Sequence, residues 1–263
     1  MDLSTSLAHF EQRGYVVLPQ ALGHAQLNDF WEEVEQNISA NQELTFALYG
    51  EVLKNRDVAG SVVRDQQVLR IIDLEDHSPK ALDLMLAPPV TQLLNAWYGE
   101  PPTAIQTLTY KYGSQQGAHS DLHLVSPPTV GAYYGRESLA AAWFACEDAD
   151  ESNGALVIYP GSHRLLKRPL QSFGEDYGAW VRYLDTLCRE RGCEPEIFNA
   201  RIGDILLWHG DLVHAGGPIR DLTRTRKSFV VHYARIPDSA RSPDPRRIRR
   251  PYLNGWHFGR CVA

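Results

Sequence analysis

Residues 118–123 read AHSDLH. The spacing of the histidine and aspartate side chains in this short segment indicates how the fold has to place them. In an extended strand, side chains two residues apart emerge on the same face. On a strand, His119 and Asp121 can therefore bind one metal ion together. The third ligand then has to come from a distant strand, and His214 in WHGDLVHAGG, residues 208–217, is the best candidate. Two imidazoles and one carboxylate occupy one face of an iron ion and leave the opposite face open.

Two further stretches favour a site of this kind. GDILLWH, residues 203–209, predicts a turn followed by a short apolar strand, with His214 at its end or just beyond. KSFVVHY, residues 227–233, predicts another strand, and Arg226 and Ser228 share its inward face. A planar guanidinium offers paired donors to a carboxylate, and a neighbouring hydroxyl adds a third hydrogen bond. The pair therefore predicts a carboxylate-binding site that accompanies the metal site.

Two alternatives remain open from the residues alone. On a strand, His123 lies on the same face as His119 and Asp121, so the two histidines are an alternative ligand pair with Asp121 supporting them. Arg224 alternates onto the same face as Arg226, but it lies in the polar run TRTR, which predicts a turn. Arg226, at the start of the strand, is the preferred carboxylate anchor.

The rest of the sequence places helices before strands. Apolar periodicity predicts helices at residues 5–13, 24–38 and 79–98, and residues 14–18, GYVVL, predict an early strand between the first two. The last of these helices is interrupted at Pro88 and Pro89, because a proline pair begins a new helix. From Thr103 onward, runs of β-branched and aromatic residues predict strands, namely TAIQTLTYKY, LAAAWFAC, GALVIYP, DILLWH and KSFVVHY. Residues 164–199 form an insert among these strands and contain a predicted helix.

Composition narrows the class of protein. The chain has 263 residues and a formal net charge of −6, which gives no basic surface for nucleic acid or an anionic membrane. No apolar run approaches the ~20 residues of a membrane span, and the N-terminus lacks the pattern of a signal peptide. The four cysteines show no CxxC pair. We therefore expect a cytoplasmic protein without membrane or nucleic-acid partners.

With these residues in view, the chain resembles the phytanoyl-CoA dioxygenase-like family of iron(II)- and 2-oxoglutarate-dependent oxygenases. The resemblance extends from GYVVLP near the N-terminus to SFVVHY. Its most specific parts are HSDLH, the block WFACEDADESNGALVIYPGSH at residues 143–163, and HAGGPIRDLTRTRKS at residues 214–228. It implies a mainly β fold, a double-stranded β-helix (jelly-roll, cupin-like) barrel with supporting N-terminal helices. We expect one domain over residues 1–263, with helical support mostly in 1–100 and the barrel mostly in 101–236.

The resemblance also implies roles for individual residues. The implied ligands of iron(II) are His119, Asp121 and His214. The residues that it places around the cosubstrate 2-oxoglutarate are Arg226 and Ser228 at the distal carboxylate, with Trp143 and Gln106 nearby. The chain departs from the family at residues 111–114, where KYGS stands in place of a common Lys-Pro-Pro-Gly run. This change concerns the lining of the pocket, so it bears on the substrate more than on the metal.

Substrate contacts are predicted in three places. The resemblance favours His123 as a residue that faces the substrate rather than the metal. Tyr134, between the metal motif and Trp143, and the insert at residues 164–199 are the other expected contacts, because loops carry most binding residues. The expected substrate is a small metabolite or natural product, and the sequence does not predict the oligomeric state.

The resulting hypothesis is a dioxygenase that uses O2 and 2-oxoglutarate to hydroxylate an unactivated C–H bond, with release of succinate and CO2. The carboxylate of Asp121 favours hydroxylation over halogenation, since the related halogenases have a small residue at that position. Desaturation, cyclisation and epimerisation remain open, because they share the same iron chemistry. A cupin-like metal hydrolase or isomerase and a non-catalytic binding module are the two rival classes, although neither needs a carboxylate anchor at Arg226.

Overall fold

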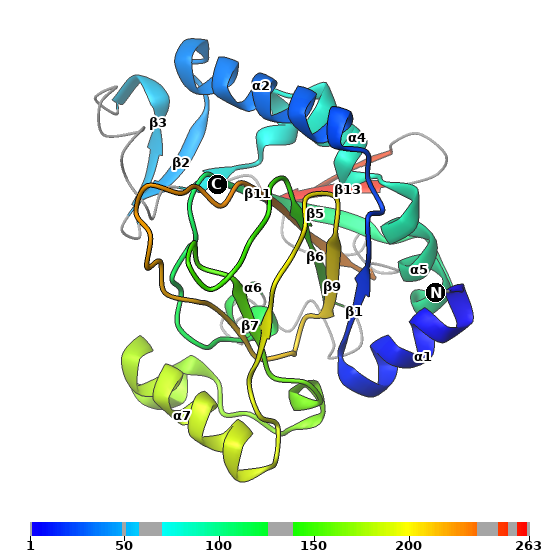
Figure 1. Cartoon of the computed structure of the whole chain (residues 1–263), viewed down its shortest axis with the longest axis vertical. Coiled ribbons are helices and arrows are strands. Elements are labelled where there is room, and N and C mark those ends of the chain that lie inside the picture. Colours follow the sequence, from blue (N-terminus) through cyan, green and yellow to red (C-terminus); the bar gives the residue numbers. More distant parts are fainter. Residues whose placement is uncertain are drawn as a thin grey trace.

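The computed structural model describes residues 2–48, 51–57, 70–125, 139–235, 247–251 and 257–261. A large sheet lies at its centre (Figure 1). In chain order, the strands along this sheet are β1 (Tyr15–Leu18), β2 (Thr45–Leu48), β3 (Glu51–Lys54), β4 (Arg70–Ile72), β5 (Thr103–Tyr110), β6 (Leu139–Ala145), β9 (Ile205–His209) and β11 (Ser228–Ala234). They are arranged as β1-β9-β6-β11-β5-β4-β2-β3, and every neighbouring pair is antiparallel. Two more strands, β12 (Arg247–Pro251) and β13 (His257–Cys261), pair with each other, and β13 pairs with β5.

A smaller sheet packs against the large one. Its strands are β7 (Leu156–Ile158), β8 (Glu196–Phe198) and β10 (His214–Gly216), in the order β10-β7-β8. An isolated bridge between His119 and His214 extends this sheet by one more segment. Apolar side chains from both sheets form one cluster between them, which includes Trp143, Leu206 and Ile158. The expected mainly β barrel with supporting helices is confirmed.

Helices cover the other face of the large sheet (Figure 1). These helices are α1 (Leu3–Arg13), α2 (His24–Ala40), α4 (Pro79–Met85) and α5 (Pro88–Tyr98). Helices α6 (Asp121–Val125) and α7 (Tyr177–Glu190) belong to the barrel half of the chain. Single 3-10 turns occur at η1 (Asn55–Asp57), η2 (Leu74–Asp76), η5 (Ser162–Arg164) and η6 (Leu170–Phe173). No helix in the described ranges combines the length and the apolar character needed to cross a membrane.

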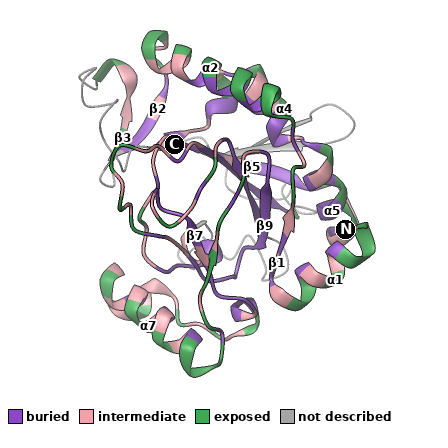
Figure 2. Cartoon of the chain, viewed as in Figure 1, coloured by how far each residue is buried: buried purple, intermediate pink, exposed green. Residues whose placement is uncertain are grey.

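Strand β6 shows how the sequence divides the two cores. All seven of its residues are buried. Ala140, Ala142 and Phe144 pack into the cluster that includes the helices, whereas Ala141, Trp143 and Ala145 belong to the cluster between the sheets. Because successive side chains on a strand point to opposite faces, the small residues let helices approach on one side while Trp143 lines the barrel interior. In Figure 2 the central strands are buried and the outer faces of α2 and α7 are exposed.

Several elements differ from the sequence-based expectation. The region before residue 100 contributes β2, β3 and β4 to the large sheet, although only helices and the strand at β1 were expected there. The predicted helix at residues 79–98 is divided at the proline pair, as expected, into α4 and α5. The insert at residues 164–199 contains α7, but it also supplies β8, which pairs with β7. β4 and β8 pair with strands far away in sequence, so local periodicity does not reveal them, whereas β2 and β3 are four-residue strands that pair with each other.

Glu75 is a buried carboxyl group on the helical side of the sheet. It is only 4% exposed, and the hydroxyl of Thr107 donates a hydrogen bond to it. Burial raises the pKa of Glu75 to about 8, and the negative charge of Asp73 adds to this effect. The folded protein therefore holds the Glu75 proton more tightly than the unfolded chain, where the pKa has its ordinary value of 4.5.

This raised pKa predicts a pH-dependent stability. Between about pH 5 and pH 7.5, the free energy of unfolding should fall by up to about 1.4 kcal/mol per pH unit, because the unfolded chain releases the Glu75 proton while the folded protein keeps it. The Glu75→Gln variant is neutral at every pH and should lose this contribution to the slope. Urea unfolding of both proteins at several pH values measures the effect. Glu32→Gln, on the exposed face of α2, is the control, and an equal slope in wild type and Glu75→Gln would contradict the prediction.

Candidate metal centre and carboxylate pocket

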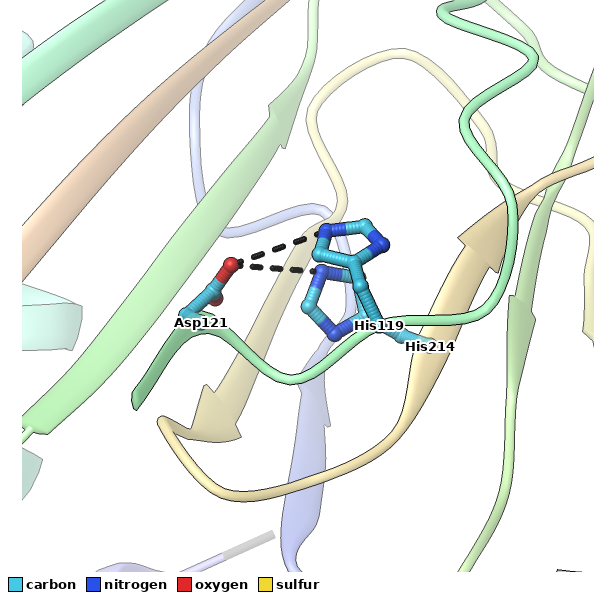
Figure 3. Close-up of side chains that lie close together, drawn as sticks. All are labelled: His119, Asp121 and His214. Atoms are coloured by element: carbon cyan, nitrogen blue, oxygen red, sulfur yellow. Dashed lines mark ion pairs between the residues drawn. The ribbon is translucent and has the colours of Figure 1, made fainter. Parts of the chain in front are cut away.

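His119, Asp121 and His214 come together as one buried cluster (Figure 3). Asp121 Oδ1 lies 3.7 Å from His119 Nε2 and 3.7 Å from His214 Nε2. The two imidazole rings have centroids 4.2 Å apart. This is the only group of three or more such side chains that the described residues bring within metal-binding distance. The structure therefore brings together the three predicted ligands from two segments far apart in sequence.

The local structure around these residues differs from the expected strand. His119 is held against His214 by backbone hydrogen bonds in both directions, from His119 N to His214 O at 2.9 Å and from His214 N to His119 O at 3.0 Å. Asp121, however, is the first residue of the short helix α6 rather than part of a strand. Leu122 N donates to Gly210 O at 2.8 Å, which fixes the start of this helix. The prediction that all of HSDLH is extended was wrong, although the two ligands still meet.

The hydrogen bonds of the two histidines suit metal binding. His119 Nδ1 lies 2.8 Å from Gly117 O, and His214 Nδ1 lies 3.1 Å from Leu212 O. A carbonyl oxygen only accepts, so each Nδ1 carries the proton and each Nε2 keeps a free lone pair. Burial lowers the pKa of His119 to about 3, so this ring is neutral at physiological pH. Neutral imidazole is the form that binds a metal.

Asp121 complements these neutral rings. Burial by itself raises the pKa of a carboxyl group, but the neighbouring imidazoles of His214, His232 and His119 outweigh burial and lower the pKa of Asp121 below its usual value. The carboxylate is therefore ionised at neutral pH. Two imidazole nitrogen donors and one carboxylate oxygen donor fit a divalent iron ion with open positions on the opposite face.

A second group of buried polar atoms surrounds Arg226. The Arg226 residue is 2% exposed, and its Nη1 donates to Gly154 O at 3.0 Å. Its Nε, the Ser228 hydroxyl and the Trp143 indole nitrogen are buried without a hydrogen-bond partner in the described part of the chain. The Arg226 guanidinium lies 5.5 Å from the centroid of the Trp143 ring. Buried polar atoms of this kind are rarely left without partners in proteins, so several donors here are available to a ligand.

The charge of Arg226 is also uncompensated by a direct ion pair within the described ranges. Burial lowers the pKa of Arg226 to about 10, while Tyr110 and Glu147 act in the opposite direction. The guanidinium still carries its charge at neutral pH. Tyr110 is buried and stands opposite Ser228 in the β5–β11 pairing. Since a buried charge is costly without a counterion, the donors around Arg226 suit a carboxylate.

The other predicted site residues have different environments. Gln106 is half-buried on β5, opposite His232 of β11, and so faces the same side of the sheet as Ser228. His123 lies on α6, and its Nε2 is 3.7 Å from Asp211 Oδ1 rather than beside the two ligand histidines. The alternative in which His123 is a ligand therefore has no support in the geometry. Tyr134 lies outside the described residues.

Two residues without a predicted role in the site contact the metal cluster. The Trp208 indole nitrogen donates to Asp121 Oδ2 at 2.8 Å, and His232 Nε2 lies 3.6 Å from the same oxygen. The alternation of side chains along β9 and β11 places Trp208 and His232 on the inner face of the sheet, where both stand opposite Ala141 of β6. This alternation is the feature of the sequence that could have identified them. Neither residue belongs to a recognisable motif, so no further sequence pattern singles them out as part of the site.

Tyr177, at the start of α7, approaches the cluster from the insert. Its hydroxyl donates to Gly117 O at 3.4 Å. Burial raises the pKa of Tyr177, the charge of Asp121 raises it further, and the charge of Arg70 lowers it. Arg70 stands opposite Tyr110 in the β4–β5 pairing, which places it on the inner side of the sheet. The insert thus brings a phenol close enough to interact electrostatically with Asp121, and β4 brings a guanidinium that interacts with this phenol.

A buried ion pair ties the insert to the metal segment. Lys167 Nζ lies 3.1 Å from Asp211 Oδ1, and its side chain has no exposed surface. The Ser120 hydroxyl, located between the two ligands of the HSD motif, donates to Asp211 Oδ1 at 3.0 Å. Lys167 also donates to Ser162 O at 2.8 Å. Asp211 therefore connects the insert to the segment that carries His119.

We expect Lys167→Met to reduce the free energy of unfolding by about 3 kcal/mol, because it removes the buried cation that lies beside the charge of Asp211. The double variant Lys167→Met/Asp211→Asn removes both charges and should recover part of that loss. Urea unfolding of the wild type, the two single variants and the double variant gives the coupling energy. Additive effects of the two substitutions would show that the pair contributes nothing, contrary to this prediction.

The comparisons with known proteins agree with the fold and the sequence motifs. The model of the family "Phytanoyl-CoA dioxygenase (PhyH)" matches residues 10–227. Peroxisomal phytanoyl-CoA dioxygenase of Bos taurus is 24% identical over 244 residues, which cover 86% of this chain and 66% of the bovine protein.

Two solved structures are similar in fold. The 2-oxoglutarate-dependent epimerase SnoN from nogalamycin biosynthesis, solved with Fe3+, alpha ketoglutarate and nogalamycin RO, has a TM-score of 0.64 at 18% identity and covers 88% of this chain and 83% of its own. The carbocyclase SnoK from the same biosynthesis has a TM-score of 0.63 at 17% identity and covers 90% of this chain and 89% of its own. The family match includes all three residues of the metal cluster and Arg226. The chain belongs to the phytanoyl-CoA dioxygenase family.

Proposed function

We propose that this protein is an iron(II)- and 2-oxoglutarate-dependent oxygenase that acts on a small molecule. The observation that carries the proposal is the buried group of Arg226, Ser228 and Trp143, with polar atoms that lack partners in the described part of the chain. Ser228 faces the same side of β11 as His232, which is 3.6 Å from Asp121. Ser228 and His232 are four residues apart, or about 13 Å along an extended strand. A short dicarboxylic acid and the Arg226 side chain together span such a distance.

Each group of residues has a part in this proposal. His119 and His214 would hold iron(II) through Nε2, and Asp121 would hold it through a carboxylate oxygen. Arg226 and Ser228 would anchor the distal carboxylate of 2-oxoglutarate, with Trp143 and Gln106 beside it. When bound, the metal and the cosubstrate supply the oxidation by O2, with release of succinate and CO2. The apolar cluster between the sheets keeps bulk water away from this region.

Hydroxylation of an unactivated C–H bond is the proposed outcome. The carboxylate of Asp121 occupies the position that a halide would need, which disfavours halogenation. SnoN and SnoK are described as an epimerase and a carbocyclase, so epimerisation and ring closure are the second candidates within the same chemistry. Product analysis distinguishes them, because hydroxylation adds one oxygen atom to the substrate, whereas epimerisation leaves the mass unchanged and ring closure by dehydrogenation removes two hydrogens.

The proposed substrate side of the pocket is bounded by residues from α6 and α7. Tyr177 lies within the electrostatic range of Asp121, and the side chain of His123 is 17% exposed although it pairs with Asp211. We propose both as neighbours of the substrate, together with Tyr134. A small metabolite or natural product is the proposed class of substrate, since the net charge of −6 disfavours polyanionic partners.

A direct test measures succinate formation by the purified protein with iron(II), 2-oxoglutarate and O2 while metabolite pools are screened. We expect succinate above the level without added metabolite for at least one pool, and no product without iron(II). A metal hydrolase or isomerase would convert its substrate without 2-oxoglutarate, and a binding module would form no succinate under any condition. Either of these results would reject the proposed function.

A further inference from the structure

The two oxygens of Asp121 have different neighbours. Oδ1 faces the ligand nitrogens of His119 and His214, at 3.7 Å from each. Oδ2 faces away from them and accepts a hydrogen bond of 2.8 Å from the indole nitrogen of Trp208. His232, on β11, has its Nε2 3.6 Å from the same Oδ2. One carboxylate oxygen is thus directed toward the metal position, and the other is held by the large sheet.

Trp208 contacts the cluster in a second way. Its ring centroid lies 4.8 Å from that of His214. Trp208 is 4% exposed and is fixed on β9 between β1 and β6. It therefore packs against one proposed ligand and donates a hydrogen bond to another. His232 is 4% exposed, and its Nδ1 has no hydrogen-bond partner in the described ranges. The polar contact of its ring is the one between Nε2 and Asp121.

We propose that Trp208, assisted by His232, is a positioning residue that restricts Asp121 to binding the metal through Oδ1 alone. A free carboxylate can bind one metal ion with both oxygens, but an oxygen that accepts a short hydrogen bond from a rigid indole is held back from the metal. With single-oxygen binding, three protein donors leave three positions of an octahedral ion open. A second oxygen from Asp121 would occupy one of them.

This inference rests on the proposed function, because it matters only if the open positions are needed for ligands. A chelating keto acid requires two adjacent positions and O2 requires a third. Asp121 bound through both oxygens would therefore compete with the keto acid more than with a ligand that takes one position. This difference gives a readout that does not depend on turnover.

The test uses Co2+ as the probe metal and compares two ligands of the Co2+-loaded protein. 2-Oxoglutarate can chelate the metal, whereas glutarate has the same two carboxylates without the keto oxygen and takes a single position. Trp208→Phe keeps an aromatic ring at this position and removes the N–H donor. We expect the dissociation constant of 2-oxoglutarate to rise about 10-fold in this variant, whereas that of glutarate changes less than about 2-fold. Isothermal titration calorimetry measures both.

The matched control is Trp31→Phe. The Trp31 indole also donates to a carboxylate, Glu35 Oε1 at 3.3 Å, but on α2, which lies on the far side of the sheet from the cluster. It should change neither dissociation constant. His232→Leu removes the second neighbour of Oδ2 and should show the same asymmetry at about 3-fold, and it decides the question if Trp208→Phe does not fold.

Equal weakening of both ligands, or no change in either, would overturn the proposal, because a structural role alone predicts no preference for the chelating ligand. Failure of the proposed function has a different signature. In that case the wild-type protein loaded with Co2+ would not bind 2-oxoglutarate at all, whatever the variants do.

Discussion

Replacing Asp121 with alanine should abolish metal binding at the cluster and lower 2-oxoglutarate-dependent turnover by at least about 100-fold. Residues that only support metal ligands already contribute about 10- to 100-fold to metal affinity or activity, so the loss of a ligand should exceed that range. Asp121 is also the only carboxylate in the cluster. Without it, two neutral imidazoles remain to compensate a doubly charged ion in a buried site, and that arrangement is unfavourable.

The measurement combines metal content with turnover. Protein loaded with iron(II) under anaerobic conditions and then desalted should retain about one metal ion per chain in the wild type and close to none in Asp121→Ala. Asp83→Ala, at an exposed position of α4, is the control for loss of a carboxylate elsewhere. If Asp121→Ala kept its metal content while 2-oxoglutarate failed to support turnover in the wild type, the assignment of this cluster would be wrong.

The sequence allowed the cluster to be predicted because the chemistry depends on few residues with a fixed spacing. His119 and Asp121 were selected from the alternation of strand side chains, although Asp121 begins a helix. His119 and Asp121 do lie close together, as predicted, but not because both belong to one strand. Only the residues up to the bridge between His119 and His214 are extended. An extended His119 followed two residues later by Asp121 at the start of a helix is enough to direct both side chains toward the metal cluster.

The large sheet could be predicted where burial follows a local pattern. Strand β6 and strand β11 are apolar runs bounded by polar or turn residues, and both were found in nearly the observed bounds. Strands β2 and β4 are short and pair with each other across a segment that separates them in sequence. Their register depends on partners rather than on their own periodicity, so propensity alone does not identify them.

The supporting residues of the site were missed for a related reason. Trp208 and His232 sit at positions that any apolar barrel strand would fill with a packing residue, and their role follows from the distance to Asp121. The pair of Lys167 and Asp211 joins an insert to a turn 44 positions later in the sequence, and no motif links them. Contacts of this kind depend on the three-dimensional arrangement, whereas a ligand motif can be read directly.

Replacing Arg226 with methionine should raise the KM for 2-oxoglutarate about 100-fold while leaving iron(II) affinity within about 2-fold of wild type. Hydrogen bonds to charged groups contribute about 1.5 to 3 kcal/mol each, and the loss of a paired guanidinium–carboxylate contact of about 3 kcal/mol corresponds to this change in affinity. Methionine fills a similar space without charge, so the packing against Trp143 is largely kept. Arg226→Lys keeps the charge but not the planar fork, and an intermediate increase of about 10-fold is expected.

Arg224 provides the matched control because it was the rival carboxylate anchor in the sequence. Its guanidinium pairs with Asp150 at 2.9 Å on the surface, so Arg224→Met should leave the KM for 2-oxoglutarate unchanged.

Pyruvate, a keto acid without the distal carboxylate, adds a second readout for Arg226. Wild type should strongly prefer 2-oxoglutarate to pyruvate in binding to the metal-loaded protein, and Arg226→Met should lose most of that preference. If Arg226→Met kept it, the distal carboxylate would have to bind elsewhere, and the unpartnered donors around Ser228 and Trp143 would require a different ligand.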